Sequence, residues 1–106
     1  MSEFVRLVNR HAMPAGTGRA FAVGRYDVAL FNIDGQFFAL ENACPHQGGP
    51  IADGWIEGMT VTCPWHAWCF DLPSGKMTLG DFAWIPRFEV RVEGEDVYVS
   101  TEPLPS

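Results

Sequence analysis

The chain has 106 residues, of which 47% are hydrophobic and 19% are charged. That length suits one domain with a packed core, so we do not expect a multidomain enzyme. Acidic residues outnumber basic ones by 13 to 7, and a net charge of -6 repels phosphate backbones, which excludes nucleic acid as an expected partner.

Alternating hydrophobic residues and frequent turn residues predict an all-β chain. With 11 glycines and 8 prolines, the sequence is interrupted too often for a helical bundle. The first predicted strands are Phe4–Asn9, 19–23, Tyr26–Ile33 and Gln36–Glu41. The last two flank Asp34 and Gly35, a dipeptide that tolerates the positive φ values of a tight hairpin turn.

The middle of the chain, 42–84, differs in character. Two loops that carry Cys and His bracket a short predicted hairpin at 54–62. We expect four of its hydrophobic residues to pack inward, namely Trp55, Ile56, Met59 and Val61. Loops hold ligands accurately only when a rigid scaffold fixes their ends, so the function is expected at the tips of these two loops.

A second hairpin is predicted near the C-terminus. Phe88, Val90 and Val92 alternate with charged residues, and the run 97–100 follows a turn. Two later prolines predict an irregular tail over 101–106. The expected fold is therefore a small antiparallel β-sandwich, all-β, in a single domain spanning 1–106.

The sequence shows no feature of a membrane or secreted chain. No run approaches the roughly 18 apolar residues that cross a bilayer, and the start MSEFVRLVNR lacks the apolar core of a signal peptide. Three cysteines are an odd number, unlike the disulfide framework of a small secreted domain. We expect a cytoplasmic protein with no membrane partner, whose thiols are metal ligands.

The ligand-capable residues form two mixed pairs. Cys44 and His46 lie in the first loop, and Cys63 and His66 lie in the second. A zinc finger usually groups its thiolates in one knuckle and its imidazoles in another. With mixed pairs, each loop can send its Cys to one metal and its His to a second, so the spacing favours a dinuclear site. A structural zinc module using the same residues is the alternative.

The segments CPHQGGP, from Cys44, and CPWHAW, from Cys63, resemble the cluster-binding loops of Rieske [2Fe-2S] proteins. The resemblance is strongest to the small soluble Rieske-type ferredoxins, and the strand pattern extends it over roughly residues 4 to 100. It implies one [2Fe-2S] cluster per subunit at a tip of the sandwich. By this resemblance, Cys44 and Cys63 hold the buried iron, and His46 and His66 hold the outer one.

Departures from the high-potential Rieske proteins predict a low reduction potential. Those proteins carry an additional Cys in each loop, where this chain has Gly49 and Trp65, and they point Ser and Tyr hydroxyls at the cluster. Trp68 and Phe70 occupy the hydroxyl positions. Without those hydrogen bonds, we expect a potential in the lower part of the Rieske span of about -150 to +300 mV, falling at alkaline pH.

Two further segments have open interpretations. Cys69 is expected to be a small hydrophobic residue, and the alternative is a ligand in a Cys3His site. Residues 79–86 are expected to form a third loop over the cluster, as a proline-containing segment does in relatives.

The resemblance implies an electron-transfer protein and not an enzyme. It would accept one electron from a reductase, expected to be a flavoprotein, and pass it to a terminal oxygenase, in this family often a ring-hydroxylating one, or to another redox acceptor protein. The oxygenase itself would need a second domain with a 2-His-1-carboxylate iron site. A Rieske-like small subunit of a nitrite reductase is the alternative within the family.

Overall fold

Strands dominate the described part of the chain. The computed structural model describes residues 3–43, 49–65, 68–78 and 83–104. In order, the elements are β1 (Phe4–Asn9), the short 3-10 turn η1 (Arg10–Ala12), β2 (Thr17–Val23), β3 (Tyr26–Ile33), β4 (Gln36–Glu41), the 3-10 turn η2 (Ile51–Asp53), β5 (Trp55–Glu57), β6 (Thr60–Thr62), β7 (Cys69–Asp71), β8 (Arg87–Glu93) and β9 (Asp96–Pro103). No helix among the described residues is both long and apolar enough to cross a membrane.

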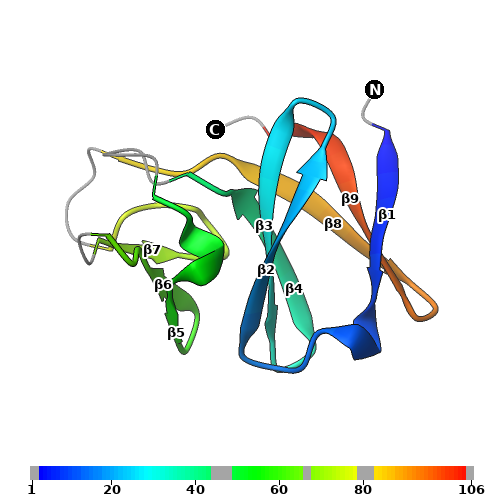
Figure 1. The fold of residues 1–106 in the computed structure, drawn as a ribbon, viewed down its shortest axis with the longest axis horizontal. Helices are drawn as coiled ribbons and strands as arrows, with labels where there is room; N and C mark the ends of the chain where they lie inside the picture. Colours follow the sequence, from blue (N-terminus) through cyan, green and yellow to red (C-terminus); the bar gives the residue numbers. More distant parts are fainter. Residues whose placement is uncertain (1–2, 44–48, 66–67, 79–82, 105–106) are drawn as a thin grey trace.

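The strands form two antiparallel sheets (Figure 1). The larger has six strands in the order β1-β9-β8-β4-β3-β2, and the smaller has three in the order β5-β6-β7. Every strand of the larger sheet contributes to one core, so that sheet curves around its own hydrophobic side chains. The buried members of this core are Val8, Met13, Val23, Val28, Leu30, Ala39, Phe88, Val97 and Val99. The predicted all-β, antiparallel fold is confirmed.

Strand β3 is buried on both faces. Val28 and Leu30 point into the core of the larger sheet, whereas Ala29 and Phe31 point into a second core with Val61 of the smaller sheet. Successive side chains of a strand face opposite sides, so two separate partners are needed to bury both sets. The smaller sheet therefore packs against the face of β3 that carries Ala29 and Phe31, and this contact joins it to the larger sheet.

The predicted strands and turns of the first half are largely confirmed. The bounds of β1, β3 and β4 are those expected from the sequence. Asp34 and Gly35 have φ values of 51° and 92°, as a tight hairpin turn between β3 and β4 requires. Strand β2 begins at Thr17, two residues earlier than expected, because its pairing with β3 extends to Asn32.

The expected inward placement of Trp55 was wrong. Trp55 is 61% exposed, although Val61 is fully buried and Ile56 and Met59 pack against the second core. Trp55 and Ile56 are neighbours in β5, so only one of them can face inward.

The predicted irregular tail was also wrong for residues 101–103. Strand β9 continues to Pro103, and the Thr101 N–H donates to the Glu3 carbonyl at 2.8 Å. Pro103 lies opposite Phe88 next to a register shift, at the end of the strand, where its missing N–H interrupts no regular ladder. Residues 105–106 lie outside the described part of the chain.

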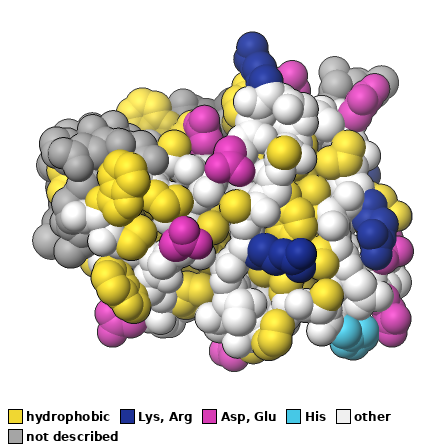
Figure 2. Space-filling model, in the orientation of Figure 1, with side chains coloured by type: hydrophobic (Ala, Val, Ile, Leu, Met, Phe, Trp, Pro, Cys, Tyr) yellow, Lys and Arg dark blue, Asp and Glu magenta, His cyan; other side chains and the backbone are white. Residues whose placement is uncertain are grey.

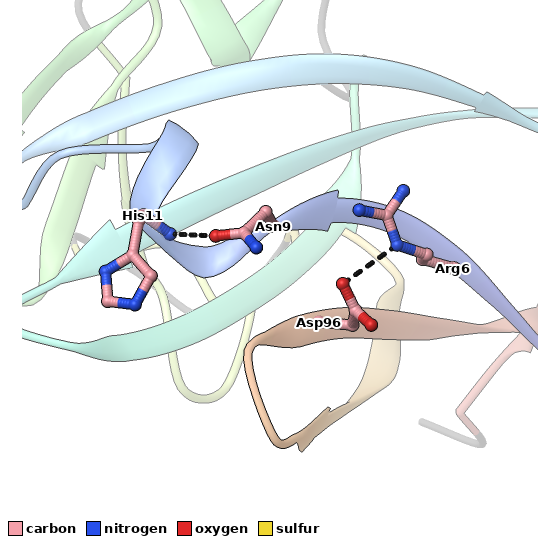
Figure 3. Close-up of polar contacts among 4 residues, drawn as sticks. All are labelled: Arg6, Asn9, His11 and Asp96. Atoms are coloured by element: carbon pink, nitrogen blue, oxygen red, sulfur yellow. Dashed lines mark hydrogen bonds and ion pairs between the residues drawn. The ribbon is translucent and has the colours of Figure 1, made fainter.

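Polar contacts at the end of β1 lie on the surface (Figure 3). The Arg6 Nε pairs with Asp96 Oδ1 at 2.9 Å, and the His11 N–H donates to Asn9 Oδ1 at 2.8 Å. The His11 ring is exposed and lies 3.2 Å from a Glu95 carboxylate oxygen. Exposed ion pairs of this kind contribute at most about 1 kcal/mol, so they fasten the edge of the sheet only weakly.

Candidate metal centre

Of the four predicted ligands, the structure places one. Cys63 is described, and Cys44, His46 and His66 lie outside the described residues. The described residues nevertheless frame both motifs, because Gly49 comes shortly after the first pair and Cys63 begins the second. The site is therefore built here from these framing residues.

Cys63 is held at the end of β6 with its side chain fully buried. Its N–H donates to the Trp68 carbonyl at 2.8 Å, which closes the chain between them into a loop. Its side chain belongs to the same core as Phe70 and Ile85. The thiol is thus fully buried among side chains of this core.

The ends of the two motif loops meet at Gly49. A Cβ on this residue would lie 2.8 Å from the Cys63 Sγ and 3.1 Å from ring atoms of Trp65. Real Cβ atoms essentially never approach other heavy atoms as closely as 2.8 Å, so only glycine fits between the sulfur and the indole. The described ends of the two loops, at Gly49 on one side and at Cys63 and Trp65 on the other, therefore lie against each other.

This arrangement fits a metal cluster. A buried thiol in a water-free position is a suitable soft ligand for iron. Gly49 places no side-chain atom against the Cys63 sulfur, where a Cβ would lie only 2.8 Å away. The residues in place are therefore compatible with a cluster held by Cys and His from both loops.

Asn42 supports the base of the first loop, a role that sequence reasoning missed. Its Oδ1 accepts from the Ala52 N–H at 2.8 Å, and its Nδ2 donates to an Asp27 carboxylate oxygen at 3.0 Å. The side chain is buried and links β3 to η2, on either side of the first motif. The sequence does show a polar residue between the hydrophobic strand β4 and the first ligand loop. That position alone does not reveal which groups the side chain would bond.

We expect Asn42→Ala to destabilise the base of this loop. The substitution leaves the buried Ala52 N–H without its acceptor, which costs about 1 to 3 kcal/mol. Urea unfolding should show this loss, with faster release of iron to a chelator. Asn9→Ala is the control, because the Asn9 side chain accepts an exposed hydrogen bond far from the loops. Equal effects of the two substitutions would contradict the supporting role.

Cys69 lies in β7 opposite Thr62 of β6. Its Sγ is 3.2 Å from the Thr62 hydroxyl oxygen, and the residue is only partly buried. The next residue, Phe70, is fully buried, so Cys69 faces the opposite side of β7. The Cys69 sulfur, in contact with the Thr62 hydroxyl, therefore lies on the outer face of the small sheet.

Large hydrophobic side chains are exposed around this region. Trp55, Trp65 and Trp84 are 61%, 59% and 51% exposed. Figure 2 shows hydrophobic side chains gathered over the part of the molecule that holds β5, β6 and β7. The third loop was expected over residues 79–86, of which residues 79–82 lie outside the described part of the chain. Within the described part of this loop, Ile85 is fully buried in the same core as Cys63.

Comparison with protein families identifies the class. The Rieske [2Fe-2S] domain model matches residues 3–100, so the chain belongs to that family. The predicted family and fold are thereby confirmed, and the cofactor that this domain carries is a [2Fe-2S] cluster.

The similar proteins include electron carriers. The ferredoxin component of the alkene monooxygenase system of Xanthobacter autotrophicus is 34% identical over 86 residues, which are 80% of this chain and 70% of that protein. Human apoptosis-inducing factor 3 is 38% identical over 87 residues, which are 79% of this chain. The chain matches only 14% of the length of that human protein.

Solved structures agree with the fold. A chain in a complex of reduced oxygenase and oxidized ferredoxin of carbazole 1,9a-dioxygenase has a TM-score of 0.90 and 27% identity, covering 97% of both chains. A Mycobacterium tuberculosis protein described as a putative NADH-dependent nitrite reductase small subunit has a TM-score of 0.89 at 20% identity, covering 94% of this chain and 96% of that one. The second likeness shows the shared fold alone.

Proposed function

We propose that the chain is a one-electron carrier whose cluster is held by Cys44 and Cys63 on one iron and by His46 and His66 on the other. The observation that carries this proposal is the buried Cys63 thiol against Gly49, inside a Rieske domain match. The bound [2Fe-2S] cluster supplies a single site for taking up and releasing one electron.

The chain's own residues prepare that site. The core around Cys63 excludes water from the sulfur, which strengthens electrostatic interactions there. The Trp65 indole lies over Gly49 and remains 59% exposed, so it covers the site and also presents an aromatic surface. A docked partner would therefore approach the electron carrier through an apolar contact.

The proposed partners are a reductase, expected to be a flavoprotein, and a terminal oxygenase, all in the cytoplasm. Support comes from the names of the relatives, which are ferredoxin components of oxygenase systems. The net charge of -6 favours basic docking surfaces on both partners. Electron transfer from the reductase and to the oxygenase should therefore slow as the ionic strength rises.

An anaerobic redox titration of the iron-loaded chain tests the proposal. We expect one reversible one-electron transition, followed by visible absorption and circular dichroism, in the lower part of the Rieske range. The reduced chain should then be reoxidised by a terminal oxygenase encoded near its gene. A colourless, redox-silent protein that binds zinc would overturn the assignment, and a transition without transfer to the oxygenase would overturn only the partner.

A further inference from the structure

A groove lies between the small sheet and the end of β9, outside the ligand loops. Its volume is about 910 Å³, within the usual range for small-molecule sites. Its lining comes from three segments: Pro73 and Lys76 follow β7, Trp84, Pro86 and Arg87 lead into β8, and Leu104 follows β9. Apolar surface predominates, and the two cations are the charged groups among the described lining residues.

The charge in this groove is opposite to that of the protein as a whole. The chain has a net charge of -6, yet the described lining residues include Lys76 and Arg87 and no carboxylate. Among the described residues, neither cation makes an ion pair. The nearby Asp71 carboxylate instead accepts from the Ser74 hydroxyl at 2.7 Å. Two cations are thus available to a ligand.

Backbone hydrogen bonds hold the groove in shape. The Ile85 N–H donates to the Gly75 carbonyl at 2.7 Å, and the Leu104 N–H donates to the Arg87 carbonyl at 2.6 Å. Gly75 has a φ of +75°, and a Cβ there would lie 2.3 Å from the Ile85 carbonyl oxygen. The walls are therefore preformed, so a ligand would not have to order them on binding.

The side chains are suited to a flat anion. Arg87 Nη1 donates to the Pro73 carbonyl at 3.2 Å, which orients the guanidinium and leaves its other N–H groups for an acceptor. Trp84 is 51% exposed and offers an indole face for stacking, and the prolines add rigid apolar walls. We propose that this groove binds a small aromatic carboxylate, with the carboxylate at Lys76 and Arg87 and the ring against Trp84.

Calorimetric titration of the cluster-loaded chain with 2-naphthoate tests this inference. We expect saturable binding at one site, weaker at high salt, and no comparable binding of the neutral 2-naphthalenemethanol. Lys76→Gln and Arg87→Gln should each lower the association constant roughly tenfold, because each removes a charge-assisted hydrogen bond. Trp84→Leu should lower it as well, through loss of stacking.

Matched controls separate the groove from general effects. Arg19→Gln removes an exposed cation on β2, and Trp55→Leu removes an exposed indole on β5; neither residue lines the groove. Both should bind 2-naphthoate as the unaltered chain does. Lys76 is exposed, so its variant should keep the unfolding midpoint and separate a binding defect from misfolding.

Four outcomes would overturn the inference, and three of them come from the calorimetric titrations. These are no binding of 2-naphthoate, binding that the groove substitutions leave unchanged, and equal binding of the neutral analogue. Binding of an acidic peptide in place of 2-naphthoate would make the groove a protein docking site and would also contradict it. Because the readout is ligand binding, failure here would leave the proposed electron transfer untouched.

Discussion

Cys63→Ala protein is expected to be purified without the visible absorption of a [2Fe-2S] cluster. The substitution removes the thiolate from a fully buried position for which no water can substitute. Because binding of a metal group to the folded chain adds to its stability, the melting temperature should fall together with iron and sulfide content. Absorption spectra, metal analysis and thermal unfolding measure these effects, and His46→Ala should give the same loss.

Cys69→Ser is the matched control for this experiment. Its sulfur lies against the Thr62 hydroxyl on the outer face of the small sheet, where a serine hydroxyl is readily accommodated. The visible spectrum and the iron content should be nearly unchanged. A Cys69→Ser protein that loses its cluster, or a Cys63→Ala protein that keeps it, would reject the assignment of the four ligands.

Gly49→Ala is expected to have the second largest effect on the metal centre, although the substitution adds only one methyl group. That carbon would lie 2.8 Å from the Cys63 Sγ and 3.1 Å from the Trp65 ring, so the sulfur, the indole or the loop backbone must move. Overpacking of this kind costs roughly 1 to 3 kcal/mol. We expect faster loss of iron to a chelator, an altered circular dichroism spectrum and a shifted reduction potential.

Gly58→Ala distinguishes this steric effect from a general loss of stability. Gly58 lies in the turn between β5 and β6, has a φ of +57°, and has open space around the position of a Cβ. Alanine there costs about 1 kcal/mol through backbone strain alone. The variant should unfold more easily but keep the spectrum and potential of the unaltered protein. Equal changes in both variants would contradict a specific role of Gly49.

Local sequence patterns were sufficient to predict much of the fold. Strands β3 and β4 and their Asp34 turn were predictable because alternation and turn chemistry act over a few residues. The family and its cofactor were predictable from paired Cys and His residues at a characteristic spacing, and the family match confirms both. The ligand assignment of Cys44, His46, Cys63 and His66 remains a prediction.

Features that depend on distant partners were not predictable. Strand β7 has three residues and forms only because β6 is beside it. Asn42 acts through Asp27 and Ala52, which are 15 and 10 residues away. The exposed position of Trp55 follows from the burial of its neighbour Ile56, and hydrophobicity alone cannot say which of two adjacent residues faces inward.

The double burial of β3 has a consequence for how the molecule unfolds. One face of β3 contributes to the core of the larger sheet, and its other face contributes to the second core. The small sheet therefore cannot separate from β3 without exposing Ala29 and Phe31 to water. In the chain without its cluster, the two layers should therefore melt in one cooperative transition, with no stable half-unfolded species. Amide hydrogens of β3 should exchange with solvent only through global unfolding. Because a bound metal group makes global unfolding rarer, slower exchange in β3 would show that the group is bound, although β3 lies outside the ligand loops.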